Sequence, residues 1–143
     1  MYLDFLLDLV FPPRCVHCAV STSRGIAACD MCLGAVSLKQ TLFCPVCGAR
    51  LAENKKICHE DSPFLLGAAG NYGDEVLRDL IHHLKFRFIR DAAKPLADFL
   101  IHYTESLNVP LEKYIVIPIP LSKERERKRG FNQSHLIAEL FAW

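Results

Sequence analysis

The chain has 143 residues, of which 51% are hydrophobic and 23% are charged, and its formal net charge is +1 at pH 7. This composition excludes a disordered chain and a protein that coats nucleic acid by overall charge, but it leaves room for a local basic patch. No apolar run approaches the roughly 20 residues that span a bilayer. The apolar start carries Asp4 and Asp8 and no basic segment. It therefore does not resemble a signal peptide, and we expect a cytoplasmic protein.

Seven cysteines near the start of the chain form a repeat. A first set of four is followed, at a constant offset of 29 positions, by three that reproduce its spacing. The two sets are Cys15, Cys18, Cys29 and Cys32, and then Cys44, Cys47 and Cys58. The position of the eighth cysteine is held by Asp61. The odd number of cysteines is thus explained by a repeat in which one thiol is replaced by a carboxylate.

This spacing predicts zinc. A Cys-x2-Cys pair places two thiolates on one turn, and two such pairs complete a tetrahedral site. For the second set we expect three thiolates and Asp61, ahead of His59, because His59 adjoins Cys58 and would need an awkward turn. The alternatives are a disulfide framework, which the missing secretory signal disfavours, and a second site that has decayed.

Two further expectations follow for the zinc segment. A full set of protein ligands leaves no open position, so we interpret both sites as structural, with metal supplying much of the folding free energy of residues 15–61. His17 lies between the first two cysteines and is interpreted as a solvated turn residue rather than a ligand.

From Phe64 the cysteines stop and the pattern of strands alternating with helices begins. Residues 64–72 predict a buried strand whose small residues permit close packing. Asp74 and Asp91 are each expected to cap an amphipathic helix. Residues 114–120 are β-branched and continuous, which is typical of a strand buried on both faces. Together these elements favour a parallel α/β sheet.

A basic segment follows the second predicted strand. Its five cations are Lys123, Arg125, Arg127, Lys128 and Arg129. We interpret it as a loop, after which Gly130 permits an unusual turn and Asn132 or Ser134 caps a helix. A strand, a glycine turn and a helix N-terminus direct backbone amides at one place, so the segment predicts a phosphate or pyrophosphate site. A solvated charged loop and a nucleic-acid patch are the alternatives, and only Phe131 supplies an aromatic ring inside the segment.

Four stretches carry a family resemblance: LVFPPRCVHC, CPVCG, LIHHLKF and VIPIPLSKERERKRGFNQS. In this order they resemble the ComF-type competence proteins, whose zinc ribbons precede a phosphoribosyltransferase-like domain and which are linked to DNA uptake and use of external DNA. The resemblance implies an N-terminal helix and double zinc ribbon in residues 1–62. It implies the first part of a Rossmann-like, parallel-sheet α/β domain in residues 63–143.

The resemblance also implies a ligand. The loop of such domains that grips phosphoribosyl pyrophosphate corresponds to Arg129, Gly130, Phe131, Asn132 and Gln133, with Lys85 as a further candidate for phosphate binding. One or two zinc ions are expected here, and Mg²⁺ with phosphoribosyl pyrophosphate only in the complete domain. The complete domain would transfer a phosphoribosyl group to an acceptor that the sequence does not name.

The family's later motif, two acidic residues followed by Thr-Thr-Gly, is absent from these 143 residues. Only two strands are predicted after Phe64, whereas open α/β sheets commonly have about five or six. We therefore expect the N-terminal portion of a longer protein, inactive on its own. The alternative function is a non-enzymatic zinc-ribbon adaptor that binds single-stranded DNA or a protein of the DNA-uptake machinery.

Overall fold

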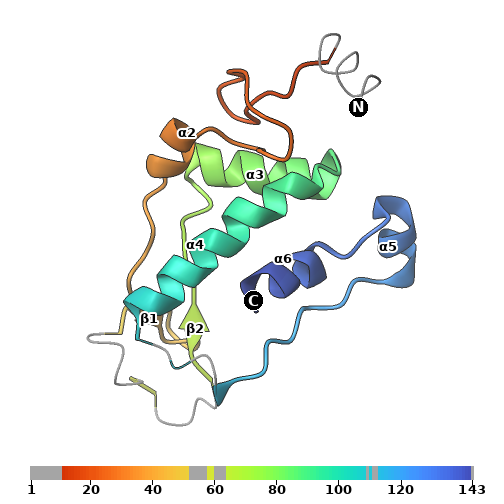
Figure 1. Cartoon of the computed structure of the whole chain (residues 1–143). Helices are drawn as coiled ribbons and strands as arrows, with labels where there is room; N and C mark the ends of the chain where they lie inside the picture. Colours follow the sequence, from red (N-terminus) through yellow and green to blue (C-terminus); the bar gives the residue numbers. More distant parts are fainter. Residues whose placement is uncertain (1–10, 52–57, 60–63, 109, 111–112, 143) are drawn as a thin grey trace.

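The computed structural model describes residues 11–51, 58–59, 64–108, 110 and 113–142 (Figure 1). The N-terminal helix expected within residues 1–62 falls on residues 1–10, and it lies outside the described residues, as does Asp61. In the described part, helix α2 (Asp30–Gly34) lies beside helix α3 (Glu75–Phe86), and strand β1 (Leu42–Phe43) lies near the C-terminal end of helix α4 (Ala93–Ser106). Helices α3 and α4 lie side by side, and α6 lies along α4.

The cysteine-rich part contains little regular structure. Helix α2 spans Asp30–Gly34, and strand β1 (Leu42–Phe43) pairs antiparallel with strand β2 (Leu66–Gly67). The strand predicted over residues 64–72 is therefore confirmed only in β2. Its predicted burial is wrong, because both residues of this short, two-stranded pairing are exposed. The expected close packing of its small residues is confirmed, because a Cβ on Gly67 would lie 3.2 Å from the Tyr103 ring and one on Gly70 would lie 2.5 Å from Leu77.

The two long helices follow their sequence patterns. Helix α3 (Glu75–Phe86) begins where predicted, because the Asp74 side chain accepts a hydrogen bond from the backbone N–H of Leu77. Helix α4 (Ala93–Ser106) follows a 3-10 turn, η2 (Arg90–Ala92). The prediction that Asp91 caps this helix is wrong. Asp91 lies inside the 3-10 turn, which runs directly into α4, so no free helix terminus exists at that position.

The parallel sheet is not confirmed. Residues 114–120 run extended without forming a strand, since no other described strand lies beside them. The interpretation of the basic segment as a loop is wrong, because it forms helix α5 (Lys123–Arg129), capped by the Ser122 hydroxyl. Its i, i+3 and i, i+4 pairing of glutamates with arginines and lysines supports a helix. Helix α6 (Gln133–Phe141) follows, and Asn132 caps it as predicted.

One apolar core joins the first cysteine set to the helices. From the cysteine-rich part it takes Cys15, Cys32 and two alanines; from the helical part it takes α3, η2, α4 and Phe131. The predicted apolar face of α3 is confirmed, and Leu80 at its centre is fully buried. The two parts of the chain therefore share one hydrophobic cluster in the described residues.

Candidate metal centres and the basic turn

The first cysteine pair sits on a tight knuckle. The backbone N–H of Cys15 donates to the carbonyl of Val20 (2.8 Å), and the N–H of Ala19 donates back to the carbonyl of Cys15 (3.0 Å). Ala19 takes a positive φ of 58°, which turns the chain back on itself. An isolated bridge between Arg14 and Ser21 closes the loop. Two thiols are thereby held on one side of a short hairpin.

The second pair repeats this knuckle at the same offset of 29 residues. The N–H of Cys44 donates to the carbonyl of Ala49 (2.9 Å), and the N–H of Gly48 donates to the carbonyl of Cys44 (2.8 Å). The positive φ, 69°, now falls on Gly48, the residue type that takes this conformation without strain. The closing bridge joins Phe43 and Arg50. The repeat in the sequence is thus a repeat of backbone geometry.

The first tetrad unites Cys15, Cys18, Cys29 and Cys32. Their sulfurs all lie within 4.8 Å of one another, and those of Cys18 and Cys29 are 3.6 Å apart. Four sulfurs at about 2.3 Å from a zinc ion would be about 3.8 Å apart. All seven cysteines of the chain are free thiols in the structure, so the disulfide framework is not formed. The donor set fits a tetrahedral zinc site.

The second tetrad unites Cys44, Cys47, Cys58 and His59. His59 Nδ1 lies 3.5 Å from the Cys44 sulfur and 3.2 Å from the Cys58 sulfur, and the sulfurs of Cys47 and Cys58 are 3.4 Å apart. The turn that seemed to keep His59 from reaching the site is therefore not an obstacle here. Three thiols and an imidazole also suit zinc. Asp61, the fourth ligand favoured from the repeat, lies outside the described residues.

Within each tetrad one thiol has a lowered pKa and another has a raised pKa. Burial opposes ionisation of Cys15, but hydrogen bonds from neighbouring backbone N–H groups lower its pKa to about 6. The backbone N–H of Cys47 is the main cause that lowers the pKa of Cys44 to about 6. Burial and the adjacent thiols raise the pKa of Cys32 to about 12, and the adjacent thiols, chiefly Cys44, raise that of Cys58 to about 12. A divalent cation between them would remove this mutual repulsion and favour all thiolates.

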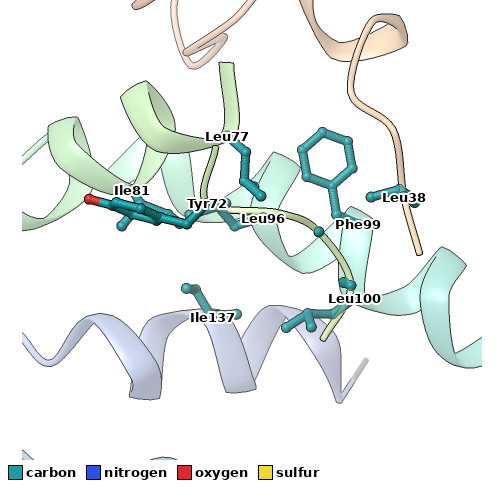
Figure 2. Close-up of a pocket in the computed structure, with 10 residues that line it drawn as sticks. Leu38, Tyr72, Leu77, Ile81, Leu96, Phe99, Leu100 and Ile137 are labelled. Carbon is teal, nitrogen blue, oxygen red and sulfur yellow. The ribbon is translucent and has the colours of Figure 1, made fainter. Parts of the chain in front are cut away.

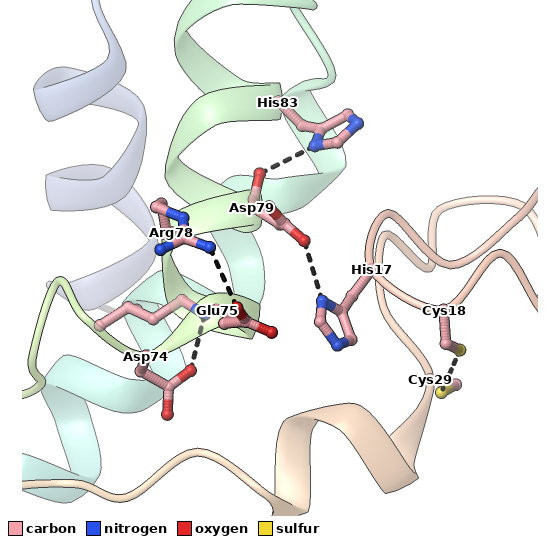
Figure 3. A network of polar contacts seen from close by, with 9 residues as sticks. His17, Cys18, Cys29, Asp74, Glu75, Arg78, Asp79 and His83 are labelled. Carbon is pink, nitrogen blue, oxygen red and sulfur yellow. Dashed lines mark hydrogen bonds and ion pairs between the residues drawn. The ribbon is translucent and has the colours of Figure 1, made fainter.

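His17 connects the first knuckle to α3, so its interpretation as a merely solvated residue is wrong. Its Nδ1 lies 2.8 Å from Oδ2 of Asp79 (Figure 3), and this hydrogen bond raises the pKa of His17. One turn further along α3, Nδ1 of His83 lies 2.8 Å from the Asp79 carbonyl oxygen. The side chains of His17 and Asp79 remain about one third exposed, at 29% and 34%. The contact therefore orients the knuckle on α3 more than it stabilises the fold.

Five of the six predicted phosphate residues form the turn between α5 and α6: Arg129, Gly130, Phe131, Asn132 and Gln133. Gly130 has a φ of 76° and ends α5, and the Asn132 side chain accepts from the backbone N–H groups of Ser134 and His135. A hollow of about 330 Å³ lies beside the turn, lined by Lys123, Glu126, Arg127 and Gly130. The first two turns of α5 and the glycine therefore border the same open space.

Three of the predicted phosphate residues are engaged in contacts within the protein. Nη1 of Arg129 donates to Oε1 of Gln133 (2.8 Å), and Phe131 is buried beneath the guanidinium of Arg90, 4.9 Å from its ring centre. Gln133 is only 4% exposed, and its Nε2 has no partner among the described residues. Lys85 is exposed at the end of α3, and no hydrogen bond or ion pair joins it to the turn in the described part of the chain.

Sequence reasoning missed the aromatic ring beside the basic helix. The guanidinium of Arg129 lies 5.7 Å from the ring centre of Phe86. The ring of His82, one turn earlier on α3, lies 4.9 Å from the Phe86 ring. Phe86 is 57% exposed. The signal was present in the sequence, as an apolar residue at the exposed end of α3, but its neighbour lies more than forty positions further along the chain.

These knuckles and tetrads define a double zinc ribbon protein, and the family model described as "Double zinc ribbon domain" matches residues 6–60. Competence protein ComFC of Bacillus subtilis is 33% identical over 108 residues, which cover 68% of this chain and 44% of the relative. DNA utilization protein YhgH of Escherichia coli K12 is 30% identical over 141 residues, covering 92% of this chain and 61% of the relative. The YhgH protein of Shigella flexneri matches equally. The chain belongs to the ComF-type competence protein family.

The chain spans less than two thirds of the length of these relatives. No solved structure matches it significantly. Among the described residues, no helix combines the length and the apolar character needed to cross a membrane.

Proposed function

We propose that this chain is the zinc-stabilised part of a DNA-handling protein and that its basic turn binds the phosphate groups of a phosphorylated ligand. By resemblance, that ligand is phosphoribosyl pyrophosphate. The names of the relatives, a competence protein and a DNA utilization protein, support the setting of DNA uptake and use. Two zinc ions would hold the ribbon, one in each tetrad, with His59 as the fourth ligand of the second.

The observation that carries the phosphate proposal is the backbone of the basic turn. After Gly130, the consecutive N–H groups of Phe131, Asn132 and Gln133 have no acceptor among the described residues. A run of amides that follows a left-handed residue forms a concave anion site. Arg127 and Lys123 border the adjoining hollow and add positive charge, diluted by Glu126. These amides and the two cations are the groups with which the turn would bind a phosphate.

Calorimetric titration with inorganic pyrophosphate tests this proposal. We expect weak, saturable binding by the wild-type chain and its loss in the double variant K123A/R127A, whose side chains are exposed and make no described hydrogen bond. The matched control is Lys94→Ala, which removes an exposed cation from α4. Equal binding by the control and the double variant would reject the site. Tight binding of phosphoribosyl pyrophosphate by these residues alone would contradict the expectation that a second, acidic motif is required.

A second candidate function is favoured by the ring of Phe86. Proteins that bind single strands without sequence preference combine a basic surface with aromatic rings on which bases stack. Exposed Phe86 lies beside Arg129, and α5 carries four more cations. A non-enzymatic adaptor that binds single-stranded DNA would use this surface, and its affinity would fall steeply with salt.

The two functions give different results with one set of variants. Phe86→Ala should weaken binding of an oligothymidine strand and leave pyrophosphate binding unchanged, because phosphate recognition uses the amides of the turn. The control Phe64→Ala removes a ring of similar exposure, 59%, from outside the basic surface. The triple variant R125A/R127A/R129A should abolish a salt-dependent shift of the strand. No shift at low salt would reject the adaptor function.

A further inference from the structure

The side chains in the turn between α5 and α6 are bonded to the protein itself. Nδ2 of Asn132 donates to the carbonyl of Ile119 (3.2 Å). Oδ1 of Asn132 accepts from the backbone N–H groups of Ser134 (2.9 Å) and His135 (3.4 Å). The ring of Phe131 is buried and belongs to the apolar core. These two side chains shape the turn, and both are already occupied before a ligand arrives.

Gln133 makes a bond across the turn. Its Oε1 accepts a hydrogen bond from Nη1 of Arg129 (2.8 Å), four residues earlier and beyond Gly130. Gln133 is 4% exposed, and its Nε2 has no partner among the described residues. A buried donor without an acceptor lowers stability, so an apolar residue would suit this position better unless the oxygen is needed. The bond to Arg129 is what requires the oxygen.

The guanidinium of Arg129 joins three helix ends. Arg129 is the last residue of α5, and its partner Gln133 is the first residue of α6. The ring of Phe86, the last residue of α3, lies 5.7 Å from the same guanidinium. A planar guanidinium can stack on a ring and donate at its edge at the same time. One side chain therefore fixes the start of α6 relative to α5 and α3.

Further along α6, apolar packing leaves space unfilled. Helix α6 lies along α4, but Ile137 faces a cavity of about 280 Å³ between α6 and the α3–α4 pair. Figure 2 shows Ile137 on one side of this cavity and Leu77 and Phe99 on the other. Apolar groups separated by a gap lose much of their attraction. The start of α6 therefore depends on the contacts at the turn.

We propose that the Arg129–Gln133 pair, which we call the clasp, holds the turn in the shape that binds phosphate. The clasp keeps the backbone N–H groups of residues 131–133 in place before a ligand arrives, so that less ordering is needed on binding. Neither side chain of the clasp touches the ligand. The resemblance to phosphoribosyltransferases assigns both residues to phosphate binding, whereas here they are positioning residues. This inference rests on the proposed function and says how the same turn achieves it.

A double-mutant cycle on pyrophosphate binding tests the clasp. Gln133→Met removes the acceptor without changing the charge, and Arg129→Lys keeps the charge but lacks the planar fork. Each variant should weaken binding, measured by NMR titration, by roughly tenfold. The double variant should bind no more weakly than either, because both changes remove the same contact. The matched control is Gln40→Met, the same exchange at an exposed position of the cysteine-rich part, and it should bind as the wild-type chain does.

Amide exchange of the free chain gives a readout that needs no ligand. The amides of residues 134–136 are bonded to Asn132, so they should exchange roughly tenfold faster in Gln133→Met. Peptides of α4 should keep their wild-type rates, whereas a merely structural role of Gln133 would loosen α4 as well. Gln133→Glu keeps an oxygen for Arg129 and should restore slow exchange at residues 134–136.

Two results would overturn the clasp. The first is pyrophosphate binding that Gln133→Met leaves unchanged. The second is a double variant in which the two single effects multiply, which would place Arg129 in direct contact with the ligand. If the wild-type chain binds no pyrophosphate, the proposed function is rejected. Faster exchange of residues 134–136 in Gln133→Met would then still support the clasp, and unchanged exchange would overturn it too.

Discussion

Removing a ligand from the first tetrad should destabilise helix α3, and removing one from the second tetrad should leave α3 unchanged, because only the first tetrad contributes to the helical core. Cys32 is 9% exposed and belongs to the apolar cluster that contains Leu80 and Leu84 of α3, whereas Cys58 is exposed and lies outside it. Cys32→Ser and Cys58→Ser form a matched pair, since each exchanges one sulfur for oxygen. Each variant should bind one zinc ion fewer than the wild-type chain.

The size of the effect follows from the packing. Structural zinc contributes about 10 to 16 kcal/mol to small ribbons, as much as the entire stability of a typical domain, so the first ribbon should open when its site is broken. If two leucine-sized side chains of α3 then become exposed, the helical core loses about 3 to 6 kcal/mol. For a chain of this length that lowers the Tm by about 10 to 20 °C. In Cys58→Ser the change should stay near β1 and β2.

The assay is amide hydrogen exchange of peptides from α3, measured by mass spectrometry. The zinc content of each variant is measured in parallel. We expect α3 to lose protection in Cys32→Ser and to keep it in Cys58→Ser. The reasoning is refuted if both variants lose one zinc and expose α3 to the same extent. It is equally refuted if Cys32→Ser loses its zinc while α3 remains fully protected.

Three further predictions concern single side chains. Tyr103→Phe removes the hydroxyl that donates to the buried Thr41 carbonyl (2.7 Å), so it should cost about 1 to 3 kcal/mol of unfolding free energy in urea. Leu80→Ala leaves a cavity at a fully buried position and should cost about 2 to 5 kcal/mol by the same measurement. If His59 is the fourth ligand of the second tetrad, His59→Ala should lower zinc content from two equivalents toward one, and Asp61→Asn should keep two.

Each of these predictions has an outcome that would contradict it. If Tyr103→Phe left the urea midpoint unchanged, the hydrogen bond from α4 to Thr41, the residue before β1, would not contribute to stability. Leu140 is 39% exposed, so Leu140→Ala is the control for Leu80→Ala, and equal losses would mean that burial is misassigned. If Asp61→Asn lost a zinc ion and His59→Ala kept both, the fourth ligand of the second tetrad would be Asp61, as the repeat favours.

The sequence by itself determined the ribbon and the main helix. The spacing of the cysteines fixes which thiols share a knuckle, because two residues between ligands allow only a tight turn, and both knuckles repeat at the predicted offset. The cap at Asp74 and the apolar face of α3 are likewise local features, set by neighbours within a few residues. Such signals depend on contacts between residues close in the chain, so they are visible before folding.

Tertiary structure decided the features that depend on distant neighbours. It placed His59 beside three thiols, a position that the spacing of the repeat did not favour, because the path of the chain around Cys58 cannot be read from that spacing. It joined His17 to Asp79 and brought Arg129 to Phe86, residues that no local pattern connects. Among the residues that the structure describes, it gave the β-branched segment after Lys113 no neighbouring strand, and a strand forms only where another strand lies beside it to satisfy its hydrogen bonds.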